Sequence, residues 1–64
     1  MAMLVPKFEV FRSKLDAQFY WRLVARNGEI LAVSEGFPFR RNAVKGARAA
    51  RRACLGARIA VVNG

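Results

Sequence analysis

Asn27-Gly28 separates two runs of strand-forming residues, and this dipeptide constrains the fold more than any other feature of the sequence. The run before it, FYWRLVA at residues 19–25, is rich in aromatic and β-branched side chains, and EILAVSE at 29–35 follows it. Asn-Gly between two such runs is typical of a hairpin with a type I′ turn, in which both central residues have positive φ. The sequence therefore predicts two antiparallel strands joined at this dipeptide.

Two further strands are predicted around this hairpin. KFEVFRS at residues 7–13 alternates apolar and charged side chains, as a half-buried strand does, and ARIAVVN at 57–63 is a short apolar run. The last strand must pair either with the sheet of its own chain or with that of a partner. Successive side chains of a strand point to opposite faces. The central run therefore presents Phe19, Trp21, Leu23 and Ala25 on one face, and Tyr20, Arg22, Val24 and Arg26 on the other.

Residues 40–54, RRNAVKGARAARRAC, change to the period of a helix. A stripe of small residues recurs along it at intervals of four, three and four, namely at Ala43, Ala47, Ala50 and Cys54. Such a stripe lets a helix approach a sheet closely, so the sheet must supply the bulky side chains. We expect these from Phe8, Trp21, Leu23 and Ile30. Cys54 is accordingly expected in the core, and Gly56 is expected to end the helix in the left-handed conformation.

The chain is short for a stable domain, and residues 1–64 are predicted to form a single one. A domain of this size buries only about 60% of the surface of its unfolded chain, and such cores are usually supplemented by disulfides, a metal or oligomerisation. One cysteine allows no intrachain disulfide, and without histidine no Cys/His zinc site can form. With 55% of its residues hydrophobic, the chain is expected to form a homo-oligomer, most simply a two-fold homodimer.

The sequence lacks the residues that most enzymatic chemistry needs. Acid–base catalysis uses a positioned histidine or paired carboxylates, whereas this chain has no histidine and four scattered acids. Cys54 as a nucleophile would need an adjacent base, and Glu35 is expected to bind a nearby arginine or backbone N–H groups. No glycine-rich phosphate loop is present. We therefore expect a protein that is not an enzyme and that uses neither a metal nor a cofactor.

Positive charge is concentrated in the second half of the chain. The net charge is +8, and residues 37–64 contribute +7 of it because they contain seven basic and no acidic residues. This asymmetry is typical of a protein that binds polyanions such as DNA or RNA. A nucleic-acid surface is predicted on the helix, with a further contribution from the sheet, at Arg41, Lys45, Arg48, Arg52, Arg22 and Arg26. The alternative is that the helical residues are only the solvated face of an amphipathic helix.

The apolar carboxyl end offers a different role. Ile59, Val61 and Val62 are predicted to lie in a dimer interface. The domain would then be a structural or protein-interaction module whose positive charge is incidental. Membrane binding is not expected, because the apolar face of the helix is Ala and Gly rather than bulky anchors. Neither a secretory signal nor a membrane-spanning run is predicted, so a cytoplasmic location is expected.

Three motifs extend over most of the chain: FEVF at residues 8–11, YWRLVARNGEILAVSEGF at 20–37, and the Ala43…Gly46 spacing of the helix. Together they resemble the YegP-like family of small uncharacterised bacterial domains. The resemblance spans residues 7 to about 62 and implies an α+β fold, a β-β-β-α-β unit with one helix packed on an antiparallel sheet. It also implies that a single-repeat member dimerises into one continuous sheet with exchanged carboxyl-terminal strands.

The resemblance implies no biochemical activity. The sequence departs from the family pattern in its helix, which is purely basic where relatives mix acidic and basic residues. It also departs in FPFRR at residues 37–41, which replaces a serine-rich helix start. A function shared by the whole family should therefore not depend on the basic helix.

Overall fold

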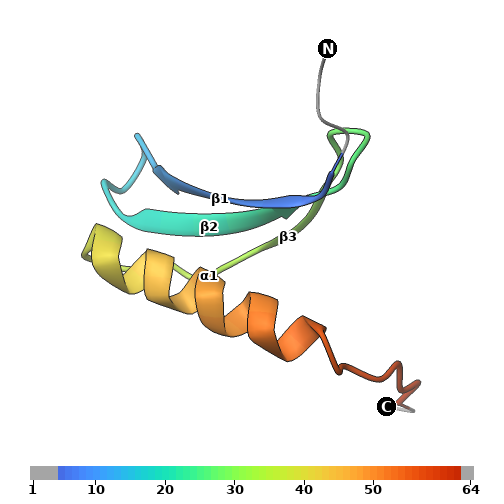
Figure 1. Cartoon of the computed structure of the whole chain (residues 1–64). Helices are drawn as coiled ribbons and strands as arrows, with labels where there is room; N and C mark the ends of the chain where they lie inside the picture. Colours follow the sequence, from blue (N-terminus) through green and yellow to red (C-terminus); the bar gives the residue numbers. More distant parts are fainter. Residues whose placement is uncertain (1–4, 63–64) are drawn as a thin grey trace.

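The computed structural model of this chain describes residues 5–62 and contains three strands followed by one helix. Strands β1 (Lys7–Arg12), β2 (Phe19–Val24) and β3 (Ile30–Val33) form an antiparallel sheet with β2 in the centre. Helix α1 (Arg40–Cys54) lies along one face of this sheet and packs on β1 and β2 (Figure 1). The predicted α+β class, with one helix packed on an antiparallel sheet, is confirmed, and the structure shows three of the four predicted strands.

The hairpin between β2 and β3 forms as predicted, but with a different turn. Of the two residues in the Asn27-Gly28 dipeptide, Gly28 has a positive φ of 91°, whereas Asn27 does not. The Gly28 N–H donates to the Ala25 carbonyl oxygen over 2.9 Å, and the Ala25 N–H donates to that of Glu29 over 2.8 Å. These bonds enclose a loop from Arg26 to Gly28, as in three-residue hairpins that place a glycine in the left-handed region. The prediction of a type I′ turn is therefore wrong.

Small residues of α1 face large side chains of the sheet. Ala43 is completely buried, and Ala47 is nearly so. A Cβ atom at Gly46 would lie 3.2 Å from the Trp21 Nε1 atom, so the absence of a side chain there permits the close approach. The Trp21 ring meets the Phe8 ring edge to face, with the centroids 5.4 Å apart. The expected division between a small-residue helix face and a bulky sheet face is present.

Three predictions about α1 and the side chains expected to pack against it are wrong. Cys54 is exposed rather than buried, because α1 slopes away from the sheet toward its carboxyl end (Figure 1). Ile30 is 54% exposed, because its register with Val24 places it on the face of the sheet away from α1. Gly56 is not left-handed. Instead, the Leu55 N–H donates to the Arg52 carbonyl oxygen, and Leu55 keeps right-handed φ and ψ of −62° and −34°.

Residues 57–62 do not form the fourth strand that the sequence predicts. They pair with no strand of the chain and run away from the end of α1 (Figure 1). Ile59, Val61 and Val62 are 98%, 92% and 84% exposed. A return of this segment to its own sheet is therefore not the arrangement in the single chain. Residue 63 of the predicted strand, and residues 1–4 of the amino-terminal stretch in which no signal peptide is expected, lie outside the described residues.

The core of the single chain is small. Among the described residues only Val24, Ala43 and Ala47 are buried, and no large side chain is completely enclosed. The accessible surface is 5743 Å², whereas a compact monomer of 7.2 kDa exposes about 4,100 Å². The radius of gyration is 13.4 Å, against about 10.7 Å for a compact chain of this length. One chain alone thus leaves much more surface in water than a compact domain does.

Candidate nucleic-acid interface

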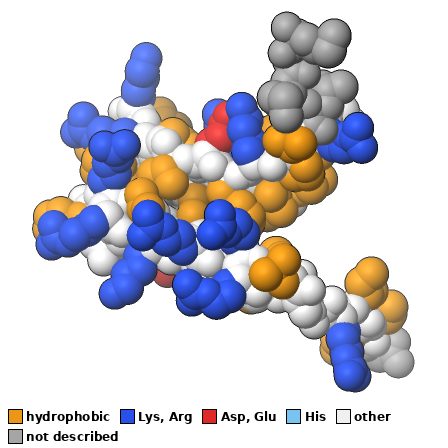
Figure 2. Space-filling model, in the orientation of Figure 1, with side chains coloured by type: hydrophobic (Ala, Val, Ile, Leu, Met, Phe, Trp, Pro, Cys, Tyr) orange, Lys and Arg blue, Asp and Glu red, His pale blue; other side chains and the backbone are white. Residues whose placement is uncertain are grey.

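The outer side of α1 carries the predicted row of basic residues. Arg41, Lys45, Arg48 and Arg52 are all exposed and lie on the side of the helix opposite Ala43. With 3.6 residues per turn and a rise of 1.5 Å per residue, they fall within an arc of about 60° along a length of about 17 Å. Figure 2 shows basic side chains gathered over the part of the surface where α1 lies. Helical periodicity therefore places these four residues correctly on one surface.

Two further arginines widen this row on its β1 side. Arg40 and Arg51 are also exposed, and Arg51 lines the groove between α1 and β1 together with Arg48. Within residues 5–62 the ion pairs all involve Glu9, so no basic residue of α1 is paired with an acid there. The six positive charges of the helix therefore remain available to an anion from outside the chain.

The first turn of α1 has charges that oppose helix stability. Phe39 is the N-cap residue and offers no side-chain hydrogen bond, and the first turn contains no acidic residue. Arg40 and Arg41 lie instead near the positive end of the helix dipole, where cations are unfavourable. The Arg41 guanidinium lies over the Phe39 ring, 4.8 Å from its centroid. Helix formation therefore does not account for these two arginines, although it does favour the arginines of the last turn.

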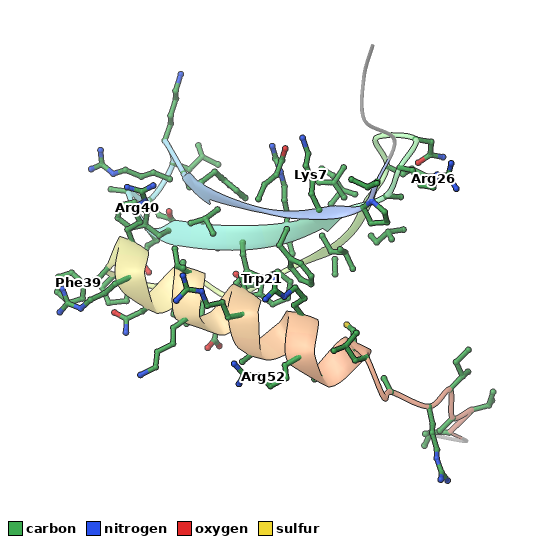
Figure 3. The ribbon with its side chains drawn as sticks, viewed as in Figure 1. Lys7, Trp21, Arg26, Phe39, Arg40 and Arg52 are labelled. Atoms are coloured by element: carbon green, nitrogen blue, oxygen red, sulfur yellow. The ribbon has the colours of Figure 1, made fainter. Side chains whose placement is uncertain are left out.

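Arg22 and Arg26 do not join the row on α1. Arg22 projects from the face of the sheet away from the helix, where its Nε donates to Glu9 Oε1 over 2.7 Å. Its guanidinium carbon also lies 4.6 Å from the centre of the Phe11 ring. Arg26 lies in the hairpin loop, at the opposite side of the sheet from α1 (Figure 3). The predicted set of six is thus divided between two surfaces.

Two acids have structural roles that the sequence analysis missed. Glu9 binds both Arg22 and Lys7, which holds the pKa of the Glu9 carboxyl below its ordinary value. Asp16 accepts a hydrogen bond from the Tyr20 hydroxyl, which lowers the pKa of Asp16 and raises that of Tyr20. Opposite charges at positions 7 and 9, which lie on the same face of β1, were a sequence signal for the ion pair between Lys7 and Glu9. The contact between Glu9 and Arg22 could be found only with the antiparallel register of β1 and β2.

Tyr20 and Glu35 also differ from what was expected of them. The ring of Tyr20, which alternation places on the same face as Arg22, stacks on Phe11 at a centroid distance of 5.8 Å. Glu35 is exposed, and within the described residues its carboxylate makes neither an ion pair nor a hydrogen bond. The expected contact of Glu35 with an arginine or with backbone N–H groups is therefore absent from that part of the chain.

The described residues also lack two other kinds of feature. No helix among them is long and apolar enough to cross a membrane. Across residues 5–62, no three His, Cys, Asp or Glu side chains come together in a group that could hold a metal ion.

Fold and surface together define a class of small α+β domain, in which a three-stranded antiparallel sheet carries one basic helix. The chain belongs to the family described as "Domain of unknown function (DUF1508)", which matches residues 16–60. It is similar to a UPF0339 protein of Methanosarcina acetivorans, with 38% identity over 59 residues that cover 92% of this chain and all of that relative. UPF0339 and the YegP-like domains are one family, so the family resemblance is confirmed.

The fold is also similar to a solved structure. The solution structure of a protein from Haloferax volcanii superposes with a TM-score of 0.76 and 33% sequence identity. The match covers 94% of this chain and all of the other. The family and its fold are thereby established, and they assign no activity to the domain.

Proposed function

We propose that this chain is a non-enzymatic, homodimeric domain that binds nucleic acid weakly and without sequence specificity through the outer face of α1. The observation that carries the proposal is the row formed by Arg41, Lys45, Arg48 and Arg52, which no acid neutralises within residues 5–62. Contacts of such side chains with phosphates position a protein on nucleic acid but carry no sequence information. The row is therefore suited to backbone binding rather than to base recognition.

The salt dependence of binding tests this proposal. Each phosphate neutralised on duplex DNA releases counterions and contributes about −0.9 to the slope of log affinity against log salt, so four contacts give a slope of about −3.6 per chain. Labelled duplex DNA and RNA would be titrated with the full chain at several potassium chloride concentrations, with fluorescence anisotropy as the readout. Absence of binding at the lowest salt would contradict the proposal.

A pair of matched variants separates the row from the total charge. Arg48→Glu with Arg52→Glu should lower the affinity for DNA more than tenfold at low salt, because two contacts become repulsive. Arg12→Glu with Lys14→Glu changes the net charge equally at exposed positions outside α1, and its effect should be several-fold smaller. Equal losses in the two variants would mean that the net charge of the chain, and not the row, determines binding.

Dimerisation is supported by the surface that one chain leaves uncovered. Its accessible surface of 5743 Å² exceeds that of a compact monomer by about 1,600 Å². Obligate dimers bury about 1,000 to 2,500 Å² on each partner, so burial against a second chain would be large enough to cover the excess. Part of it belongs to the exposed apolar segment at residues 57–62. We infer that this segment of each chain pairs with the sheet of the other, as the family resemblance implies.

The free edge of β1 is the acceptor that the geometry favours for this segment. Helix α1 lies under β1 and β2, so a chain returning from the helix end would run beside β1, and a swapped segment takes the equivalent place on the partner. The edge has six residues, as does the segment at 57–62, which would extend about 20 Å as a strand. A groove of about 630 Å³ between α1 and β1, lined by Phe8, Leu23 and Val44 among others, could receive its apolar side chains.

Light scattering and sedimentation test the dimer. A stable monomer at micromolar concentration would contradict it. Ile59→Asp with Val61→Asp should shift the equilibrium toward monomer, because both side chains would point into the groove. Ala60→Asp introduces charge on the opposite side of the same strand and should have a smaller effect.

The alternative function remains a structural or protein-interaction dimer with incidental charge. A dimer that binds neither DNA nor RNA at low salt would support this alternative and remove the first. In either case we propose a cytoplasmic location, where the single exposed thiol of Cys54 would stay reduced.

A further inference from the structure

The face of the sheet away from α1 is hollowed at its hairpin end. A cavity of about 780 Å³ opens there between the start of β1, the end of β2 and the hairpin loop. Its lining includes Lys7, Glu9, Arg22, Val24, Arg26 and Ile30. Lys7 and Arg26 both lie on the side of the sheet away from α1 in Figure 3. The cavity is thus separate from the basic row of the helix.

Positive charge exceeds negative charge around this cavity. Three basic side chains and a single acid, Glu9, line it. Both Glu9 oxygens are already engaged, one by the Arg22 Nε at 2.7 Å and the other by the Lys7 Nζ at 3.0 Å. Arg26 has no acid partner within residues 5–62. The remaining N–H groups of Lys7, Arg22 and Arg26 can therefore donate to an incoming anion, and one carboxylate leaves a net charge of +2.

The floor and one wall of the cavity are aliphatic. Val24 is buried on this face of β2, and Ile30 stands beside it on β3 as its partner in the strand register. Val5 completes the apolar part of the lining, and no aromatic residue contributes to it. The nearby aromatic pair, Phe11 and Tyr20, is stacked within the protein and lies outside the cavity. A flat base would find no ring to stack on here, whereas an alkyl chain would find matching surface.

We propose that this cavity binds a small organic anion with an aliphatic body, such as a medium-chain carboxylate. The anionic group would lie among Lys7, Arg22 and Arg26, and the alkyl chain would cover the exposed aliphatic side chains of Val5 and Ile30. The charged group gives orientation, and each buried methylene adds about fourfold to the affinity. This site is independent of nucleic-acid binding, because it lies on the opposite side of the sheet from α1.

The test is to titrate small organic ions into the full chain and to monitor its amide chemical shifts by two-dimensional NMR. Octanoate below its micellar concentration is expected to bind saturably and to shift the amides of Lys7, Val24 and Ile30. Octyl phosphate should bind at the same residues, because it offers the same anionic chemistry. Acetate should bind at least tenfold more weakly, because it lacks the alkyl body, and octyltrimethylammonium should not bind at this site.

Charge-removing variants locate the site. Lys7→Gln and Arg26→Gln should each weaken octanoate binding several-fold, whereas Lys45→Gln, which removes the same charge from α1, should leave it unchanged. Equal loss in the Lys45 variant, acetate binding as tightly as octanoate, or shifts without saturation would overturn the proposal. A short single-stranded oligonucleotide that shifts the cavity residues and displaces octanoate would overturn it in favour of an extended nucleic-acid surface.

Discussion

Ser34 is expected to be the residue at which the smallest chemical change most affects stability. Its Oγ accepts a hydrogen bond from the Trp21 N–H over 2.9 Å and donates to the Glu35 carbonyl oxygen over 2.8 Å. Ser34→Ala removes one oxygen and leaves the N–H of a half-buried core residue without its acceptor. An unsatisfied donor of this kind costs about 1 to 2 kcal/mol. For a domain of this size, we expect the melting temperature to fall by about 5 to 15 °C.

The assay is thermal unfolding at one fixed chain concentration, because the melting temperature of the proposed dimer would depend on concentration. Ser34→Thr keeps the hydroxyl and serves as the matched control, with a change of less than about 3 °C expected. Amide hydrogen exchange gives a local readout, since the Trp21 amide should exchange faster in the alanine variant only. An alanine variant that melts within about 2 °C of the parent, with unchanged exchange at Trp21, would refute the assigned role of the hydroxyl.

Three other changes test the packing and the charges. Phe39→Asp supplies the missing N-cap acceptor of α1 and should add about 1 kcal/mol to the free energy of unfolding, whereas Phe39→Ala should add nothing; circular dichroism during thermal unfolding compares them. Gly46→Leu should lower the free energy of unfolding by about 1 to 3 kcal/mol, because the new side chain would collide with Trp21. Ala49→Leu, at an exposed position of the same helix, is the control and should change it by less than about 0.5 kcal/mol. The folded-state pKa of Glu9 is lowered, chiefly by Arg22, so its ion pairs stabilise the chain above the ordinary glutamate range and this contribution is lost as the pH falls through the folded pKa. Glu9→Gln should therefore lose less melting temperature on acidification than the parent chain does, and an equal loss would contradict the assignment.

Local patterns in the sequence predict the elements of this fold well. The change from a two-residue to a helical period marks α1, and the helix has the predicted limits of residues 40 and 54. The strands fall within the predicted runs, since aromatic and β-branched residues bounded by turn signals are a local property. The turn type was wrong because hairpin loops of two and three residues share the same Asn-Gly signal. Their difference depends on which backbone bonds close the loop.

What the sequence could not give is the position of the helix on the sheet. The apolar pattern assigns Ile30 and Cys54 to a core. Cys54 is exposed because α1 slopes away from the sheet at its carboxyl end, and Ile30 is exposed because its register with Val24 places it on the face away from α1. The prediction of the candidate site is a different case, because one of its errors could have been avoided from the sequence alone. The alternation in β2 places Arg22 on the face opposite Trp21, and Trp21 was already assigned to the helix side. The separation of Arg22 from the helical row therefore follows from the sequence.

The charge of the chain links its two proposed properties. Each chain has a net charge of +8, so dimerisation brings two strongly positive molecules together, and their repulsion extends over about 10 Å at 0.1 M salt. Added salt should then strengthen the dimer while it weakens nucleic-acid binding. A bound polyanion would relieve the same repulsion without salt, and because such coupling is reciprocal, the dimer should bind nucleic acid more tightly than the monomer. The unneutralised row on α1 would thus be unfavourable for the proposed free dimer and favourable for the same dimer on nucleic acid.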